Sequence, residues 1–255
     1  AEELFWLNWQ ENLLGDWYMD GLVGSVEKRR NVQESSLGDL MEVGAVGSAP
    51  GFTGQDDGAY QFNGESYLLI NDDDQLTTSE LTISLWFQFP RLNSTMTLLS
   101  KLENGDRSYD LSICGVGSDK GKVMWGTTSQ PASPLTYLMS QTIIMTKRWY
   151  HLVVVQSALG RFIYLDGQLD NSDAVGNVVP NSTAPLLVGK QIFDGVDYFL
   201  FQGEIDELVI SAGSMSASDV NIYHDLLVAG LPTEISQPVS ELIFNLESDY
   251  STVGL

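Results

Sequence analysis

The feature that most constrains the fold of this chain is the recurrence of short runs rich in Val, Ile, Phe, Tyr, Trp and Thr, separated by clusters of Gly, Asn, Asp and Pro. Such runs, when they alternate with a period of two, are typical of β-strands. In residues 80–89 one face carries Leu81, Ile83, Leu85, Phe87 and Phe89 and the other is mostly polar, which predicts a half-buried strand. We expect further strands at residues 59–62, 66–70, 97–101, 107–114, 122–127, 149–156, 161–165, 185–188 and 204–211.

The clearest turn and the clearest helix lie in the second half of the chain. Asp166-Gly167 separates two apolar runs, and Asp-Gly suits the positive φ angles of a type I′ turn, so a tight hairpin is expected there. Ser216 and Asp219 have the spacing of a helical capping box. The apolar stripe that follows at helical spacing consists of Val220, Tyr223 and Leu227. Gly230 then ends a short surface helix.

Many strands with one late helix favour sheet packed on sheet, because no alternation of strands and helices indicates a parallel sheet. The fold class is therefore all-β, with two antiparallel sheets and one short C-terminal helix. We expect residues 1–230 to form a single sandwich. Residues 231–255 are interpreted as a linker and an extra strand, 241–255, which either pairs with the sandwich, mediates self-association or begins a further domain.

The charge balance excludes some classes of partner. The chain has 34 acidic and 12 basic residues, a formal net charge of −22, which disfavours nucleic acid and anionic membranes as partners. No stretch approaches the roughly 20 apolar residues of a membrane helix, so no membrane insertion is expected. Cys114 is the only cysteine and lies in an apolar run, so we expect a buried thiol and no internal disulfide.

Six phrases of the sequence point together to one family. They are residues 16–21 (DWYMDG), 59–70 (AYQFNGESYLLI), 81–87 (LTISLWF), 149–154 (WYHLVV), 164–167 (YLDG) and 201–208 (FQGEIDEL). In this order they resemble the bacterial laminin-G-like jelly-roll family, which has a concanavalin A-like fold. The resemblance extends over about residues 13–228 and implies a jelly-roll β-sandwich with a ligand site on its concave face or loop rim.

The same resemblance implies a structural calcium ion where the closing strand meets an early turn. The residues that match are Asp206, Asp56, Asp57 and Gly64, the last through its carbonyl oxygen. Ca²⁺ takes six to eight oxygen ligands, so further carbonyls or waters would complete such a site. The acidic turn at residues 71–74 is interpreted instead as a solvated turn.

A catalytic interpretation of the closing strand is weaker. Residues 204–209 resemble the E-x-D-x-x-E motif of laminarinase-type glycoside hydrolases, and strand alternation would place Glu204, Asp206 and Leu208 on one face. Val209 stands where those hydrolases have the second essential glutamate, so we expect no enzymatic activity. The two histidines, His151 and His224, are expected to be structural.

These observations favour a non-catalytic extracellular recognition or adhesion module that binds carbohydrate or a surface protein. Trp125 is expected on an open face near Tyr109, where the two rings would bind a glycan, whereas Trp86, Trp149 and Tyr164 are expected in the core. One alternative is a structural or assembly domain of a surface appendage or virion fibre. Another is an accessory domain of a glycan-degrading enzyme.

Overall fold

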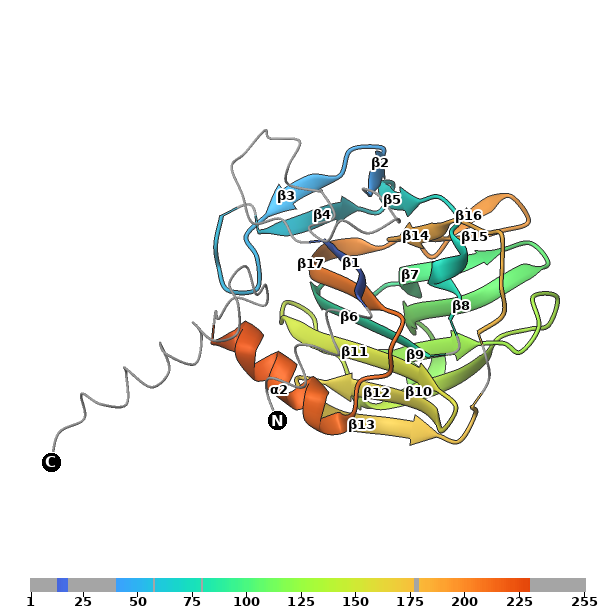
Figure 1. The fold of residues 1–255 in the computed structure, drawn as a ribbon. Helices are drawn as coiled ribbons and strands as arrows, with labels where there is room; N and C mark the ends of the chain where they lie inside the picture. Colours follow the sequence, from blue (N-terminus) through green and yellow to red (C-terminus); the bar gives the residue numbers. More distant parts are fainter. Residues whose placement is uncertain (1–12, 18–39, 57, 79, 177–178, 230–255) are drawn as a thin grey trace, which may run out of the picture.

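A computed structural model describes residues 13–17, 40–56, 58–78, 80–176 and 179–229. Two antiparallel sheets lie face to face, and helix α2 (Ala217–Val228) covers part of the outside (Figure 1). The predicted all-β, two-sheet antiparallel sandwich is therefore confirmed. Asp57 and the tail at 231–255 lie outside the described residues, so the domain boundary and strand-mediated self-association remain predictions.

The first sheet has eight strands. Its main path runs in the order β13 (Gln168–Asp173), β12 (Gly160–Leu165), β11 (Tyr150–Ser157), β6 (Leu81–Gln88), β17 (Gln202–Ser211), β4 (Ala59–Asn63) and β3 (Gly47–Ala49). Strand β1 (Leu13–Trp17) also pairs with β17. Asp166 and Gly167, with φ angles of 49° and 77°, join β12 to β13, which agrees with the predicted type I′ turn.

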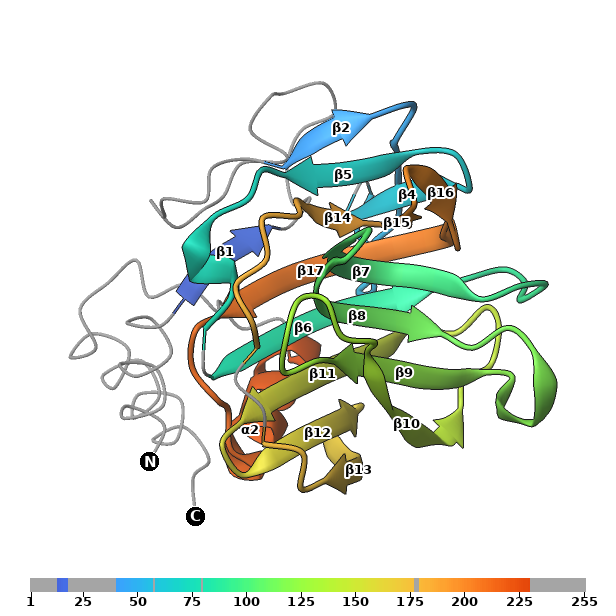
Figure 2. The same cartoon turned by 90° about the vertical axis from the view of Figure 1, so that its right-hand side faces the viewer.

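The second sheet has seven strands and faces the viewer in Figure 2. Its order is β10 (Thr136–Ile143), β9 (Lys122–Thr127), β8 (Asp106–Ile113), β7 (Met96–Glu103), β14 (Leu186–Val188), β5 (Tyr67–Ile70) and β2 (Met41–Val43). Strands β15 (Gln191–Phe193) and β16 (Val196–Tyr198) form a separate hairpin beside β14 and β7 (Figure 2). The sequence interpretation missed β2, β3, β10, β15 and β16.

The core lies between the sheets and is built from alternate residues of each strand. From β6 it takes Leu81, Ile83, Leu85 and Phe87, none of which is exposed. Burying one such side chain contributes about 1.5–3 kcal/mol. The other face of β6 is buried as well, except for Gln88, so the expectation of a half-buried strand is wrong. Cys114 is buried and unpaired, as expected.

Helix α2 covers this outer face of β6 and its neighbours. The capping box is present, because the Asp219 amide donates to Ser216 Oγ and the Ser216 amide donates to Asp219 Oδ2. The stripe on the buried side packs on the sheet in a second apolar cluster, which contains Val220, Tyr223, Leu227, Trp86, Val153, Val155, Tyr164 and Val209. Both faces of the central strands are therefore largely covered.

Within the part of the chain that the structure describes, three basic side chains are buried, each beside one aspartate. The pairs are Lys101 with Asp72, Arg161 with Asp173, and Lys190 with Asp197. The arginine is bidentate, because Nε and Nη2 donate to the two Asp173 oxygens at 3.1 and 2.6 Å. Its positive charge and hydrogen bonds hold the pKa of Asp173 below the ordinary value, although burial opposes this.

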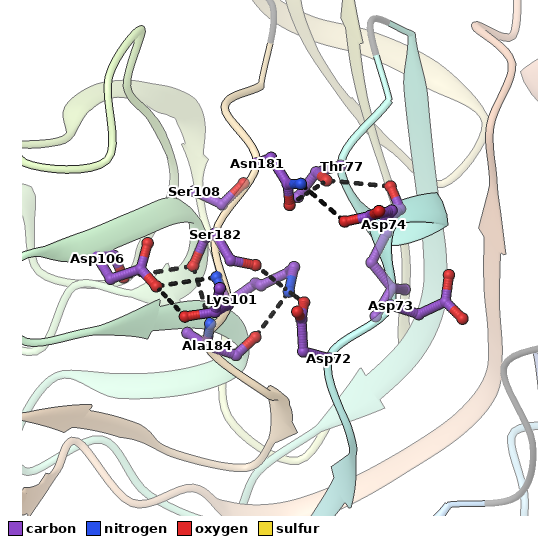
Figure 3. A network of polar contacts seen from close by, with 12 residues as sticks. Asp72, Asp73, Asp74, Thr77, Lys101, Asp106, Ser108, Asn181, Ser182 and Ala184 are labelled. Carbon is purple, nitrogen blue, oxygen red and sulfur yellow. Dashed lines mark hydrogen bonds and ion pairs between the residues drawn. The ribbon is translucent and has the colours of Figure 1, made fainter.

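Lys101 holds two distant segments together (Figure 3). Its ammonium donates to Asp72, to the carbonyl of Ser182 at 2.9 Å and to that of Ala184 at 2.6 Å. Asn181 also donates to Asp74 at 2.7 Å. The acidic turn at residues 71–74 is thus anchored to the neighbouring loop by a buried cation, rather than being merely solvated.

Replacing Lys101 with methionine should lower the free energy of unfolding by about 3 kcal/mol, because two carbonyls and a carboxylate lose their common donor. Denaturant titration measures this. Lys122→Met is the matched control, since Lys122 forms a partly exposed ion pair with Asp119, and its loss should cost less than about 1 kcal/mol. Equal losses in the two variants would show that the buried ammonium contributes no more than a surface charge.

Candidate functional site

A cleft of about 480 Å³ opens on the outer face of the eight-stranded sheet. It lies beyond the area that α2 covers, where the loop between β3 and β4 crosses the sheet. Its lining consists of Ala49, Pro50, Gly51, Phe52, Thr53, Gly54, Gln61, Gln88, Trp149 and Glu204. Clefts of this size that combine apolar walls with a few converging polar groups are typical of small-molecule sites.

The floor of the cleft is polar and comes from three adjacent strands. Glu204 of β17 pairs in register with Gln61 of β4 on one side and with Gln88 of β6 on the other. Gln61 Nε2 donates to Glu204 Oε1 at 3.4 Å. Burial raises the pKa of Glu204 above its ordinary value, and the hydrogen bond from Gln61 opposes this rise. Two amides and one carboxylate thus present donors and acceptors side by side.

The walls of the cleft contain aromatic side chains. Trp149, just before β11, is partly buried. Phe52, on the loop between β3 and β4, stacks on Trp86 with ring centroids 4.1 Å apart and an angle of 10° between the ring planes. The Phe52 amide donates to Asp206 Oδ2 at 3.1 Å. A Cβ on Gly51 would lie 2.7 Å from the same oxygen, so this loop passes directly over Asp206.

The aromatic stack continues from the cleft to helix α2. Trp86 stacks on His151 at 5.0 Å and on His224 at 5.5 Å between centroids. The two histidine Nδ1 atoms are 3.1 Å apart, and His151 Nε2 is 2.9 Å from Ser84 Oγ. Burial, and then the charge of His224, lower the pKa of His151 well below its ordinary value. Burial also lowers the pKa of His224, although Asp166 and Asp225 oppose it.

The residues predicted to bind calcium do not all meet. Asp206 is buried, and its Oδ1 also accepts the Glu207 amide at 2.8 Å. Asp56 is exposed on the adjacent loop, and Asp57 lies outside the described residues. Gly64 lies beside Gln202, four residues before Asp206 along β17 and so about 13 Å away. Ligands of one Ca²⁺ ion lie within about 5 Å of each other. The strand geometry therefore separates Gly64 from Asp206, and the calcium site stays a prediction.

The predicted glycan-binding pair is not on an open face. Trp125 and Tyr109 are both fully buried between the sheets, with ring centroids 5.7 Å apart. Trp125 pairs with Leu111 and Leu138, whose side chains fix the inward phase of β9. The expectation of exposure is therefore wrong, because the alternation of residues 122–127 alone does not say which face is inside. The Tyr109 hydroxyl donates to the Leu76 carbonyl at 3.1 Å.

The closing strand contains a β-bulge that changes its phase. Glu207 has a φ angle of 49°, and the pairing with β6 shifts register between Asp206 and Val209. Leu208 consequently lies in the core between the sheets, not on the face of Glu204 and Asp206 as alternation had predicted. Val209 lies under α2. Glu204 is the one carboxylate in the cleft lining.

Sequence reasoning did not assign the cleft. Trp149 was expected in the core, and Gln61 and Gln88 were not singled out. The usable signal was that both glutamines lie in the outward phase of their strands, opposite the apolar residues that form the core. Their convergence depends on the pairing of β4, β17 and β6, which are far apart in the chain.

Comparison with known proteins identifies similar folds. The sequence model of a family described as the concanavalin A-like lectin/glucanases superfamily matches residues 62–221. No curated protein gives a significant match. Among the described residues, no helix has the length and apolar character required to span a bilayer.

Among solved structures, domain 4 of AbnA, a GH43 extracellular arabinanase from Geobacillus stearothermophilus solved with arabinotriose, has a TM-score of 0.65 and 21% identity over 83% of this chain and 97% of that one. Botulinum neurotoxin type C, described as depending on two ganglioside molecules for entering cells, has a TM-score of 0.64 and 11% identity over 87% and 52%. The binding domain of Paraclostridial Mosquitocidal Protein 1 has 0.64 and 14% over 84% and 52%. The chain spans about half of these two toxin chains. At these identities the likeness shows the fold alone.

Acid should destabilise the docking of α2 through the histidine pair. Because the folded state favours neutral imidazoles, the unfolded chain binds more protons below the ordinary histidine pKa of about 6.5, and the free energy of unfolding falls with pH below that value. Between pH 7 and 5, the melting temperature of the wild type should therefore fall more steeply than that of His151→Gln.

Asp110 contributes to the pH dependence of stability in the opposite direction, and it does so equally in the wild type and in His151→Gln. Burial raises its pKa to about 7, although hydrogen bonds from Ser112 and Tyr137 act against burial. A folded carboxyl with a raised pKa adds stability as pH falls from about 7 toward its ordinary value. Only the difference between the two plots of melting temperature against pH therefore reports on His151. If the two plots run parallel, the histidine pair is not the source of the acid sensitivity.

Proposed function

The chain belongs to the concanavalin A-like lectin/glucanases superfamily, and from this membership we propose that its cleft binds carbohydrate without cleaving it. The observation that carries the proposal is the arrangement of Trp149 beside a floor of Gln61, Gln88 and Glu204. Amide and carboxylate groups can donate to and accept from sugar hydroxyls, while an indole ring packs against the apolar CH face of a sugar. Of the solved structures of similar fold, one is a complex with arabinotriose, and another belongs to a toxin whose cell entry is described as dependent on interaction with two ganglioside molecules.

The absence of catalysis is part of this proposal. Glycoside hydrolysis generally needs two carboxyl groups on opposite sides of the scissile bond. Glu204 lines the cleft, whereas the Asp206 carboxylate accepts the backbone amides of Phe52 and Glu207 and lies under the loop. Val209, at the position of the second essential acid, packs under α2. Glu204 is thus suited to accept hydrogen bonds from a sugar.

We also propose an extracellular or cell-surface location and a stabilising calcium ion. The location is favoured by the fold and by the extracellular arabinanase of similar structure. For the ion, Asp206 offers a buried carboxylate directly beneath the loop that contains Gly51 and Phe52 and leads to Asp56. Carbonyl oxygens of that loop are suitable additional ligands for a hard cation.

Replacing Trp149 with alanine should weaken saccharide binding about fivefold, because an aromatic contact is worth about 1 kcal/mol. Calorimetry with arabinotriose, xylotriose, cellotriose and maltotriose measures the effect. Trp149→Phe should retain part of the affinity, and Leu159→Ala, an exposed apolar change on the turn after β11, should retain all of it. An unchanged affinity for a bound saccharide in Trp149→Ala would move the site elsewhere.

Removing calcium should lower the melting temperature, since a ligand that binds only the folded state stabilises it by about 4 kcal/mol at a thousandfold excess over its dissociation constant. Ca²⁺ should restore the temperature better than Mg²⁺. In Asp206→Ala the difference between EDTA and Ca²⁺ should vanish, whatever the intrinsic stability of that variant. Identical wild-type curves, with no metal found by elemental analysis, would refute calcium binding.

A further inference from the structure

The hairpin of β15 and β16 stands outside both large sheets. Its strands pair with each other, Gln191 with Tyr198 and Phe193 with Val196, and within the described residues neither strand pairs with any other. Figure 2 shows it beside β14 and β7. Residues 191–199 are called the aromatic hairpin below. An isolated two-stranded hairpin is only marginally stable, so this one depends on its contacts with the rest of the protein.

The aromatic hairpin presents apolar side chains to solvent. Phe193 is 40% exposed, Val196 53%, Tyr198 42% and Phe199 41%. The rings form an edge-to-face series, with 6.3 Å between the centroids of Phe193 and Tyr198 and 6.0 Å between those of Tyr198 and Phe199. Adjacent exposed aromatic residues of this kind mark a recognition surface more often than single exposed residues do.

The hairpin is held firmly at its base. The buried Lys190 ammonium donates to Asp197 at 2.6 Å and lies 3.5 Å from the centroid of the Tyr67 ring. Ser100 Oγ donates to the Lys190 carbonyl at 2.8 Å. The surrounding contacts therefore fix the hairpin relative to β7 and β5.

Backbone strain occurs where the aromatic series ends. Phe199 has a φ angle of 51°, a left-handed conformation that is unfavourable for a residue with a Cβ. The Thr97 amide donates a hydrogen bond to the Phe199 carbonyl at 2.7 Å, which holds Phe199 in this conformation. Strained residues held by their surroundings occur preferentially at binding sites. Here the strained residue also keeps its ring exposed.

Charged groups flank the rings. The Arg107 guanidinium carbon is 5.6 Å from the centroid of Phe193. Its two hydrogen bonds, to the carbonyls of Ala132 and Ser133, are long at 3.4 Å, and a guanidinium has five N–H donors. Asp194, at the tip of the hairpin, supplies a carboxylate. Donors and acceptors therefore lie beside stacking surfaces.

The size and charge of the surface decide between occupants. The exposed parts of these four side chains offer roughly 300 Å², whereas a stable protein interface buries about 800 Å² on each partner. One or two sugar rings fit the smaller area. A neutral sugar is favoured over an anionic one, because Asp194 and the net charge of −22 repel anions.

We propose that the aromatic hairpin, together with Arg107, is a second carbohydrate-binding surface, which takes one or two rings of a neutral saccharide. It shares the class of ligand of the proposed function but not its site. The cleft lies on the outer face of the eight-stranded sheet, whereas the hairpin lies beside the seven-stranded sheet. Each surface can therefore be tested without the other.

The test uses the whole chain, an array of neutral glycans and titration with the same four trisaccharides. Tyr198→Ala should weaken binding at the hairpin about fivefold, because it removes one aromatic contact, and Arg107→Gln should weaken it similarly. Both should leave binding at the cleft unchanged. Trp149→Ala should leave the hairpin site intact, and the double variant Trp149→Ala/Tyr198→Ala should lose both sites. Leu159→Ala and melting curves control for surface changes and folding.

The outcomes separate the two proposals. Binding that survives Trp149→Ala and is lost in Tyr198→Ala supports the hairpin even if the cleft binds nothing. Binding that Trp149→Ala abolishes and Tyr198→Ala leaves unchanged overturns the hairpin alone. No binding to any glycan of the array overturns both. A change in sedimentation caused by Tyr198→Ala without sugar would assign the surface to a second copy of this chain and also overturn the proposal.

Discussion

The structure depends on covering both faces of the eight-stranded sheet. Strands β6, β11 and β17 carry apolar side chains on each face, because they occupy the middle of the sheet. The seven-stranded sheet covers the inner face, and α2 with the loop at Phe52 covers much of the outer one. Trp86 lies at the junction, in contact with the loop and both histidines. The cleft exists because this cover ends before the edge of the sheet.

The β-bulge at Glu207 determines what the uncovered region contains. Before the bulge, β17 directs Glu204 and Asp206 outward, and after it Leu208 returns to the core while Val209 meets α2. Strand β17 therefore contributes a polar residue to the floor of the cleft at one end and an apolar surface for α2 at the other. Asp206, at the boundary, binds the loop that forms the cleft wall. The polar floor of the cleft and the docking of the helix thus depend on the same backbone irregularity.

The sequence predicted what local patterns determine. The strands, the Asp166-Gly167 turn and the capped helix follow from alternation, turn chemistry and capping, and each is present. Local patterns did not determine which face of β9 is buried, so the prediction for Trp125 was wrong. They also did not indicate the bulge at Glu207, because no local residue preference predicts it. The cleft combines β4, β6 and β17 through long-range pairing, which the order of residues along the chain does not encode directly. Strands β15 and β16 were too short to show alternation.

The burial of Lys101, Arg161 and Lys190 affects how the molecule meets its surroundings. Among the described residues, three basic side chains are enclosed beside aspartates and contribute little to the outer surface. The surface of this part of the chain therefore carries even fewer positively charged side chains than its composition indicates. Two molecules that approach each other experience mutual repulsion over several ångströms, which dissolved salt screens over about 8–10 Å. Such a surface favours dispersion of the molecules in solution, so that close packing of many copies side by side requires salt to screen their charge.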